Sequence, residues 1–218
     1  MPEAAGFALV LASGSPRRAN LLAQAGIAPD HIIPPEFDET QKPRELPREY
    51  ALRVAIGKAE QVARDFTGAF VLAADTVVAA GRRILPKAET PETVEQCLLL
   101  LSGRRHQVIT AVAVVSPGGK LHCRSALTRV AFKRLSVREI RTYVASEEGL
   151  GKAGGYAIQG RAETFIRSIN GSYSNVVGLP LLETLSLLES AGWRQPVNVR
   201  TFESDAAMSG SPAKSGVI

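Results

Sequence analysis

Leu9-Val10-Leu11-Ala12-Ser13-Gly14-Ser15-Pro16-Arg17-Arg18-Ala19-Asn20-Leu21-Leu22 is the stretch from which the fold of this chain can be worked out. The apolar run at 7–12 has the length and the polar boundary of a buried strand. Ser15 suits the N-cap of a helix and Pro16 its first position, where the missing N–H costs nothing. Gly26 is placed to end that helix. The stretch therefore predicts a strand, a tight polar loop and a helix start.

The predicted helix start gathers groups that attract anions. Arg17 and Arg18 stand in its first turn, where the helix dipole disfavours positive charge. Free backbone N–H groups and the hydroxyls of Ser13 and Ser15 lie beside them, and a phosphate group fits this combination best. The alternative is a solvated helix start whose arginines pair with nearby carboxylates, and the stretch alone leaves both readings open.

Length and composition limit the class of protein. The 218 residues suffice for one large α/β domain or two small lobes, and 45% hydrophobic with 22% charged residues is ordinary for a globular protein. The net charge of +5 suits an anionic partner, but no run of Lys or Arg appears, so nucleic acid is not expected. We expect a folded domain over residues 1–200 and a disordered tail at 201–218, where the composition turns to Ser, Ala and Gly.

The cysteines and the chain start bear on location. Cys97 and Cys123 lack metal-ligand spacing and are expected to be buried thiols in a reducing compartment. The N-terminus lacks the basic region of a signal peptide, and the apolar runs are shorter than the roughly 20 residues that span a bilayer. We therefore expect a cytoplasmic protein with no membrane partner.

Periodicity and turn signals predict the remaining elements as an α/β arrangement. Further strands are expected at 31–33, 70–80, 106–115, 121–135 and 162–169. Further helices are expected at 48–64, 91–101, 137–146 and from 181 to Gly192. The segment 34–40, with three carboxylates, and the segment 172–179 are expected to be loops.

Two charged residues interrupt apolar patterns. Lys58 lies in the helical stripe of Ala51, Val54, Ala55, Ala59 and Val62. Its ammonium either reaches past the core to water or points into a cleft. Asp75 lies mid-strand on the predicted face of Val71, Ala73 and Val77, with Thr76 on the other face. A carboxylate there needs a cation, either a metal ion in a functional site or a structural partner such as arginine.

The chain contains the groups that phosphate-ester chemistry uses. Three isolated lysines, Lys58, Lys87 and Lys152, join the predicted anion site, and Glu39 and Asp75 are suited to bind magnesium. The glycine-rich segment 149–160 lacks the order of a P-loop, the three histidines form no close ligand pair, and no G-x-S-x-G elbow occurs. These patterns alone do not say which reaction takes place.

Several long motifs add a resemblance. The chain is similar to the Maf family of nucleoside triphosphate pyrophosphatases over about residues 9–188. The matching segments are Leu-Ala-Ser-Gly-Ser-Pro-Arg-Arg at 11–18, Ala-Asp-Thr-Val-Val at 74–78, Leu-Ser-Gly-Arg-Arg-His at 101–106, Lys-Ala-Gly-Gly-Tyr-Ala-Ile-Gln-Gly at 152–160 and Gly-Ser-Tyr-Ser-Asn-Val-Val-Gly-Leu-Pro at 171–180. The resemblance implies an elongated, mixed, twisted β-sheet flanked by helices, with two lobes around a central cleft, in a protein that is often a homodimer.

The resemblance also implies an activity. Members hydrolyse a nucleoside triphosphate between the α and β phosphates, giving a monophosphate and pyrophosphate, and require a divalent cation such as Mg²⁺ or Mn²⁺. By motif, Asp75 is the proton acceptor, and Arg17, Thr76 and Gln159 set base preference, matching the branch for dTTP and UTP rather than methylated GTP. The Gln159 amide can match the adjacent donor and acceptor of uracil or thymine, provided that Thr76 or a backbone group fixes its orientation. Family members are also linked to septum formation and cell-division arrest.

Two departures and two competing functions remain. The family usually has Gly-Lys-Pro where this chain has Pro86-Lys87-Ala88, and an acidic residue where it has Gly151. That acid could have been a partner for a metal ion or for Lys152, so its loss makes Lys152 a weaker candidate for the site than Arg17 and Asp75. A non-catalytic nucleotide- or RNA-binding protein is one alternative, disfavoured by the intact motifs and by 6% aromatic residues. A phosphotransferase is the other, disfavoured because no P-loop or kinase motif occurs.

Overall fold

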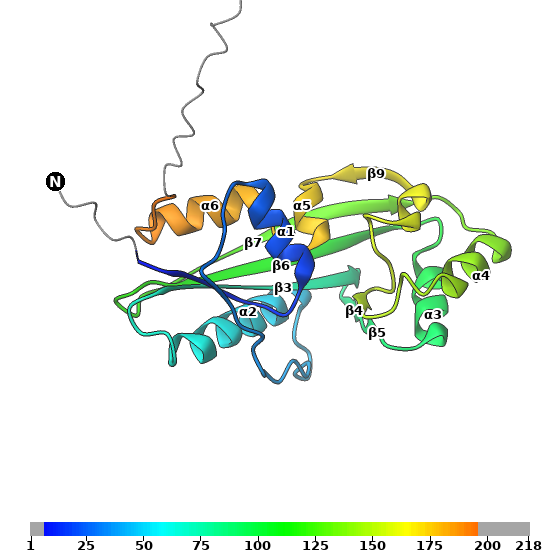
Figure 1. Ribbon diagram of the computed structural model, residues 1–218. Coiled ribbons are helices and arrows are strands. Elements are labelled where there is room, and N and C mark those ends of the chain that lie inside the picture. The colour runs from blue at the N-terminus through cyan, green and yellow to red at the C-terminus, as the bar shows by residue number, and fades with distance from the viewer. Residues whose placement is uncertain (1–6, 196–218) are drawn as a thin grey trace, which may run out of the picture.

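The structure is a computed structural model that describes residues 7–195, a mixed α/β fold drawn out along one axis (Figure 1). The helices are α1 (Pro16–Gln24), α2 (Pro47–Ala63), α3 (Pro91–Leu101), α4 (Val137–Ala145), the 3₁₀ helix η1 (Arg161–Phe165), α5 (Tyr173–Val177) and α6 (Leu181–Ser190). The strands are β1 (Leu9–Ala12), β2 (His31–Ile32), β3 (Phe70–Ala80), β4 (Arg83–Leu85), β5 (Lys87–Ala88), β6 (Arg105–Val115), β7 (Leu121–Phe132), β8 (Lys152–Ala153) and β9 (Ile166–Asn170).

The main sheet mixes parallel and antiparallel pairs. Its order is β2-β1-β3-β6-β7-β9, with β4 paired to the end of β3. β1 runs parallel to β2 and β3, whereas the pairs from β3 through β6 and β7 to β9 are antiparallel. β5 and β8 form a separate two-stranded sheet. The expected mixed sheet is confirmed.

β3 lies in the middle of the sheet and is buried on both faces. Leu72 and Ala74 belong to one apolar cluster, and Val71 and Ala73 to another on the opposite face. A strand covered on both sides can be apolar at every position, which is why 70–80 is a continuous apolar run. The predicted strand is confirmed at the same residues.

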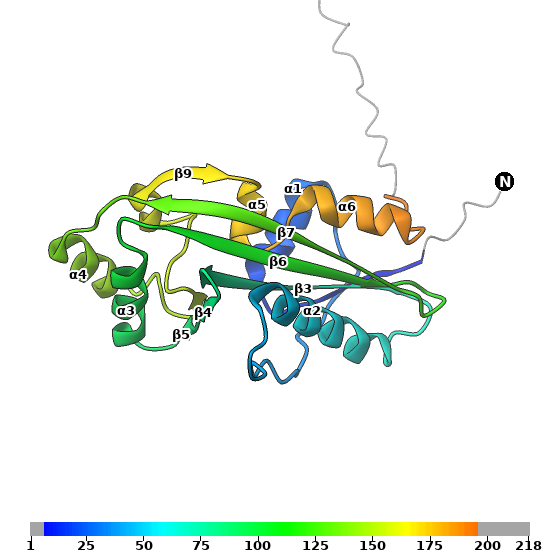
Figure 2. The same cartoon turned by 180° about the vertical axis from the view of Figure 1, so that it is seen from behind.

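The helices cover the two faces unequally (Figures 1 and 2). α2 supplies the smaller cluster, packing against β3 and β6, whereas the larger cluster takes residues from α1, α3, α4, α5 and α6. α1, α2 and α6 gather toward one end of the molecule, and α3 and α4 lie at the other with β4 and β5 (Figure 1). This matches the expected elongated form with two lobes.

α3 and α4 begin at side-chain caps, and α1 begins at the predicted Pro16. The Thr90 hydroxyl accepts a hydrogen bond from the Thr93 N–H at 3.2 Å, and Ser136 and Glu139 form a reciprocal capping box at α4. Pro16 occupies the first turn of α1, and Gly26 follows that helix with φ of 72°. A left-handed residue at this place suits glycine and ends the helix as predicted.

Two element predictions near the C-terminal part are wrong. The expected strand at 162–169 is η1 followed by β9, because the buried residues Ala162 and Phe165 are three apart, the repeat of a 3₁₀ turn. The expected loop at 172–179 contains α5. There the Ser172 hydroxyl accepts a hydrogen bond from the Asn175 N–H at 3.2 Å, which caps the helix.

The strand expected at 121–135 ends at Phe132, and the prediction of a buried Cys123 is also wrong. Cys97 is buried in α3, but Cys123 is exposed in β7. β9 pairs with β7 over Arg129–Phe132, which leaves the part of β7 around Cys123 at the edge of the sheet. The tail expected at 201–218 lies outside the described residues. Between residues 7 and 195, no helix has the length and apolar character needed to cross a membrane.

Candidate active site

One cavity of about 730 Å³ receives most of the residues that the sequence singles out. Its wall is built by the β1–α1 loop, the 34–41 loop, α2, the centre of β3, the segment 84–87, the segment 151–159 and the end of α5. The predicted residues in this wall are Ser13, Ser15, Arg17, Arg18, Glu39, Lys58, Asp75, Thr76, Lys87, Lys152 and Gln159. A cavity of this size holds a small-molecule ligand.

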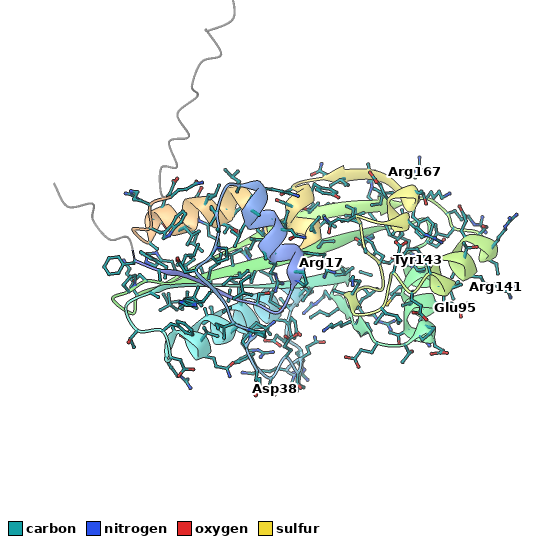
Figure 3. All side chains as sticks on the ribbon, viewed as in Figure 1. Arg17, Asp38, Glu95, Arg141, Tyr143 and Arg167 are labelled. Atoms are coloured by element: carbon teal, nitrogen blue, oxygen red, sulfur yellow. The ribbon has the colours of Figure 1, made fainter. Side chains whose placement is uncertain are left out.

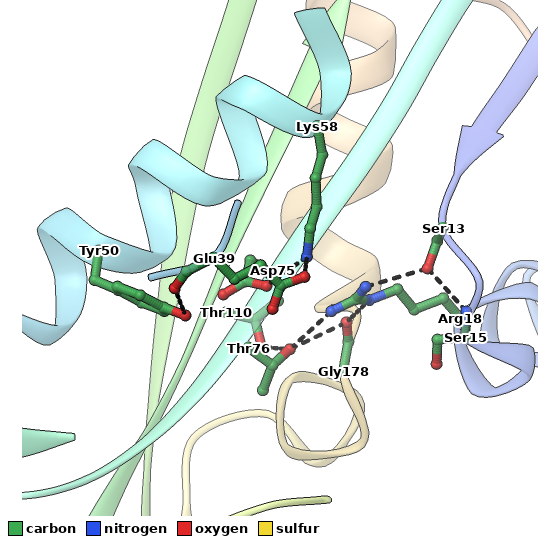
Figure 4. A network of polar contacts seen from close by, with 10 residues as sticks. All are labelled: Ser13, Ser15, Arg18, Glu39, Tyr50, Lys58, Asp75, Thr76, Thr110 and Gly178. Atoms are coloured by element: carbon green, nitrogen blue, oxygen red, sulfur yellow. Dashed lines mark hydrogen bonds and ion pairs between the residues drawn. The ribbon is translucent and has the colours of Figure 1, made fainter. Parts of the chain in front are cut away.

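Arg18 ties the β1–α1 loop to two other elements (Figure 4). Its Nε donates to the Gly178 carbonyl at 2.9 Å, Nη1 to the Ser13 hydroxyl at 3.2 Å, and Nη2 to the Thr76 hydroxyl at 3.3 Å. Burial lowers the pKa of Arg18, and the Asp75 carboxylate opposes that shift. Its partners are thus a carbonyl and two hydroxyls rather than the carboxylates of the alternative reading. The Ser15 side chain makes no capping bond, although its N–H donates to the Ser13 hydroxyl at 3.2 Å.

Lys58 joins two carboxylates inside the cavity wall (Figure 4). Its Nζ lies 2.8 Å from Oδ1 of Asp75 and 2.6 Å from Oε1 of Glu39. Lys58 and Asp75 are 7% and 6% exposed, whereas the Glu39 side chain is 49% exposed. Of the two readings of Lys58, the ammonium directed into a cleft is therefore correct.

The loop that carries Glu39 is held against α2 at several points. Arg53 makes a two-point pair with the Glu45 carboxylate at 2.6 and 2.9 Å, and the Tyr50 hydroxyl donates to the Glu39 carbonyl at 2.8 Å. The Phe37 ring packs on Gly57 so closely that a Cβ there would lie 2.2 Å from two ring carbons. Burial, with the charges of Asp75 and Glu39, raises the pKa of Tyr50 to about 12.

Besides Arg18, three cations face the cavity without a carboxylate partner among the described residues: Arg17, Lys87 and Lys152. Lys87 and Lys152 lie on the paired strands β5 and β8. Burial lowers the pKa of Lys152, and the charges of Arg17 and Lys87 lower it further. Mutual repulsion of this kind is relieved by a bound anion.

The glycines of the 149–160 segment serve close packing. A Cβ on Gly154 would lie 2.8 Å from Val78, and one on Gly155 3.1 Å from Cys97. Gly151, where the family usually has an acid, has φ of 68°, and its N–H donates to the Ala88 carbonyl at 2.7 Å. A side chain at Gly151 would be strained in this turn.

Thr76 and Gln159 share the cavity but have different surroundings. The Thr76 hydroxyl is hydrogen-bonded to that of Thr110 at 2.9 Å and accepts from Arg18. The sequence offered Thr76 or a backbone group as the partner that orients the Gln159 amide, and among residues 7–195 neither is hydrogen-bonded to it. Gln159 is exposed at the wall, and residues 7–195 form no hydrogen bond with its side chain.

Sequence reasoning missed Tyr50 and Thr110. Tyr50 lies two helical turns before Lys58, on the same face of α2, which is a signal that spacing contains. Thr110 interrupts the apolar run of β6 as Asp75 interrupts that of β3, and the two strands pair Thr110 directly with Thr76.

A metal ion has two potential protein ligands here. Glu39 and Asp75 flank Lys58, and carboxylate oxygens are ligands that Mg²⁺ and Mn²⁺ accept. Residues 7–195 contain no group of three or more His, Cys, Asp or Glu side chains placed to hold a metal. Two carboxylates still fit Mg²⁺, which keeps several waters and takes further oxygens from substrate phosphates.

Comparison with known proteins gives a consistent result. Residues 8–191 match the family described as Maf-like protein. A Rhodospirillum rubrum protein named dTTP/UTP pyrophosphatase is 61% identical over 186 residues, covering 85% of this chain and 89% of that protein. A protein of the same name from Caulobacter vibrioides is 58% identical over 191 residues, covering 88% and 99%.

Proposed function

This chain belongs to the Maf-like protein family, and we propose that it hydrolyses nucleoside triphosphates, dTTP and UTP above all, to the monophosphate and pyrophosphate. The observation that carries the proposal is the position of the buried Asp75 carboxylate, which faces the same cavity as Arg17, Lys87 and Lys152. The names of relatives 55–61% identical to this chain support the substrate.

We assign the triphosphate to the cationic part of the cavity. Arg17, Lys87 and Lys152 offer unpaired positive charge, and the Ser15 hydroxyl and the first turn of α1 add donors. Arg18 adds charge while its hydrogen bonds keep Ser13 and Thr76 in place. The Thr76–Gly178 side of the cavity is thereby fixed before substrate arrives.

We assign Asp75 as the proton acceptor. Water supplies the oxygen for the new phosphorus–oxygen bond as the bond joining the α and β phosphates breaks, and its proton passes to the Asp75 carboxylate. Lys58 holds Asp75 by Oδ1 at 2.8 Å and offsets part of the combined negative charge of Asp75 and Glu39. The strand and helix that carry this pair are rigid elements, which keeps the base in a fixed orientation.

Glu39 and Asp75 are the residues that would hold a divalent cation, Mg²⁺ or Mn²⁺. Such an ion supplies charge neutralisation and orientation of the phosphate oxygens. Tyr50 fixes the backbone of Glu39 through its carbonyl, whereas the exposed side chain is held only by the contact of its carboxylate with Lys58. The carboxylate can therefore change its orientation to meet a metal ion.

We assign base recognition to Gln159, with Arg17 and Thr76 as further members of the set. Gln159 carries both a donor and an acceptor, is exposed at the cavity wall, and belongs to the segment between Tyr156 and Gly160. An amide can pair with the N–H and carbonyl of uracil or thymine.

A product assay tests the proposed function. The protein is incubated with UTP, dTTP, CTP, ATP and GTP and Mg²⁺, and phosphate products are separated. Pyrophosphate with a monophosphate is the expected result. Orthophosphate with a diphosphate would indicate a phosphotransferase-like or phosphatase reaction, and the absence of product with retained nucleotide binding would indicate the non-catalytic alternative.

Three finer points remain proposals from the sequence: a single pyrophosphatase domain over residues 1–200, a homodimer and a cytoplasmic location. A role in clearing unwanted nucleotides and a link to cell-division arrest belong with them. Analytical ultracentrifugation of the full chain tests the dimer directly.

A further inference from the structure

The segment that carries Gln159 is fixed from outside the cavity. Tyr156, Ala157, Ile158 and Gln159 line the cavity, but Tyr143, His106 and Glu148 are absent from its described wall. Tyr143 and His106 are hydrogen-bonded to residues of this segment, and Glu148 is hydrogen-bonded to Arg161 just after it. The three side chains come from α4, from β6 and from the loop after α4.

Tyr143 holds the centre of the segment. Its hydroxyl accepts the Ala157 N–H at 3.0 Å, and the side chain is 1% exposed with its ring 5.4 Å from that of Phe165. Figure 3 shows Tyr143 near α4, away from Arg17 at the start of α1. Tyr143 therefore fixes the backbone two residues before Gln159. It does so from a buried position that a ligand bound at Arg17 does not reach.

His106 and Glu148 hold the two ends. His106 Nε2 is hydrogen-bonded to the Tyr156 hydroxyl at 2.8 Å, and both side chains are buried against Phe132. Glu148 accepts the Arg161 N–H at 2.8 Å, and its carboxylate lies so close to Gly160 that a Cβ there would be 2.1 Å from Oε2. The Gly160 N–H donates to the Ala157 carbonyl at 3.1 Å and closes a turn. His106 holds the chain before this turn, Tyr143 at its start and Glu148 after it.

The Gln159 side chain forms no hydrogen bond with residues 7–195, so the place from which it reaches into the cavity is set by its backbone alone. We propose that Tyr143, His106 and Glu148 are positioning residues for Gln159, and that base discrimination depends on the hydrogen bond between the Tyr143 hydroxyl and the Ala157 N–H. This inference rests on the proposed role of Gln159 in reading the base. A backbone that shifts at Ala157 carries the Gln159 amide away from the edge of uracil, and an amide that is no longer held there can turn about its terminal side-chain bond and pair with the reversed donor and acceptor pattern of cytosine.

The test measures nucleotide binding without turnover. Dissociation constants for non-hydrolysable analogues of UTP and CTP are measured by calorimetry for the unmodified protein and for Tyr143→Phe, which keeps the ring and removes the oxygen. The preference for the UTP analogue should fall roughly three- to tenfold, the range for residues that act on a site without touching its ligand. Tyr173→Phe is the matched control, because it removes the same oxygen from a half-exposed tyrosine of α5.

A second pair of variants separates positioning from general stability. Glu148→Gln keeps an oxygen that can accept the Arg161 N–H and should retain the preference, whereas Glu148→Ala should lose it. Equal weakening of both analogues in Tyr143→Phe, or an unmodified protein without preference, would overturn the inference. Pyrophosphate release from UTP is measured separately, so failure of the proposed reaction is distinguished from failure of the positioning role.

Discussion

The Nζ atom of Lys58 lies 2.8 Å from Oδ1 of Asp75, and both side chains are more than nine-tenths buried. This pair joins α2, which among residues 7–195 is the helix that covers this face of the sheet, to the central strand. Removing one member of a buried pair leaves the other charge without compensation. When Asp75 is the member removed, Glu39 lowers that cost, because its carboxylate still lies 2.6 Å from the Lys58 ammonium.

Asp75→Asn should keep the fold and lose the reaction. The amide keeps the shape and an oxygen for Lys58, while loss of the proton acceptor alone should lower kcat roughly 10²–10⁴-fold. Pyrophosphate release at saturating UTP measures this, with circular dichroism as the check on folding. Asp65→Asn, an exposed aspartate just after α2, is the matched control. A folded Asp75→Asn protein with nearly normal turnover would contradict the assignment.

The adjacent arginines should behave differently. Arg17→Ala should weaken binding of a non-hydrolysable triphosphate with little change in melting temperature, since no hydrogen bond or ion pair of residues 7–195 involves its side chain. Arg18→Ala should weaken binding and also lower stability by about 1–3 kcal/mol, because it deprives the Gly178 carbonyl, Ser13 and Thr76 of their donor. Equal melting temperatures for the two variants would show that the Arg18 contacts contribute nothing to stability.

Gly57→Ala should loosen the loop that carries Glu39. The added methyl group would meet the Phe37 ring at 2.2 Å, so the ring must move, at a cost of about 1–3 kcal/mol. Activity should then need a higher Mg²⁺ concentration, measured by titrating the metal at fixed UTP. Gly118→Ala is the control, since nothing lies within 4 Å of its added Cβ. Adding Phe37→Ala should restore stability to the Gly57→Ala protein, and failure to do so would place the strain elsewhere.

Gln159→Leu should lower catalytic efficiency for UTP and dTTP far more than for GTP. A site that leaves polar groups unpaired can discriminate up to about 10⁴-fold, and leucine removes the groups that make the distinction. The kcat/KM values for UTP, dTTP, CTP and GTP in both proteins provide the comparison. If all four fall by the same factor, Gln159 supports its segment and does not read the base.

Stability should fall in mild acid because of His106. Burial lowers its pKa from 6.5 to about 4, so the folded protein takes up the proton only near pH 4, whereas the unfolded chain takes it up near pH 6.5. The favourable contribution is complete above pH 6.5 and is lost as pH falls toward 4, with about 2 kcal/mol lost by pH 5. Denaturant unfolding at pH 7 and pH 5 measures the difference, which should shrink in His106→Gln. An unchanged pH dependence in that variant would assign the acid sensitivity to other groups.

The sequence predicted those elements whose local signals agree with their packing. The apolar run at 70–80 and the capped helices at 91–101 and 137–146 were predicted nearly to the residue. α5 was missed because Tyr-Ser-Asn-Val-Val has no apolar stripe, and its position depends on contacts with β6 and β7. β4, β5 and β8 are two or three residues long, too short to show any period.

The sequence predicted which residues belong to the site but not which of them contact one another. Lys58 and Asp75 each stood out as a charge within an apolar pattern, but no local rule joins a helix position to a strand position 17 residues later. Gln159 has no such signal, because it lies in a glycine-rich turn. Its role was predicted only from the family motif. Thr110 was visible by the same reasoning as Asp75 and gained meaning only from the β3–β6 pairing.

Asp75 and Thr76 follow one another in β3 but face opposite sides of the sheet, toward Lys58 and toward Arg18. A shift of the β3–β6 pairing by one residue would exchange them, and the carboxylate and the hydroxyl would each meet the wrong partner. Insertions and deletions within the nine residue pairs of that ladder should therefore abolish activity even where hydrophobicity is preserved. Length changes in the turn at 116–120 leave the ladder in register, so natural length variation between β6 and β7 should accumulate there.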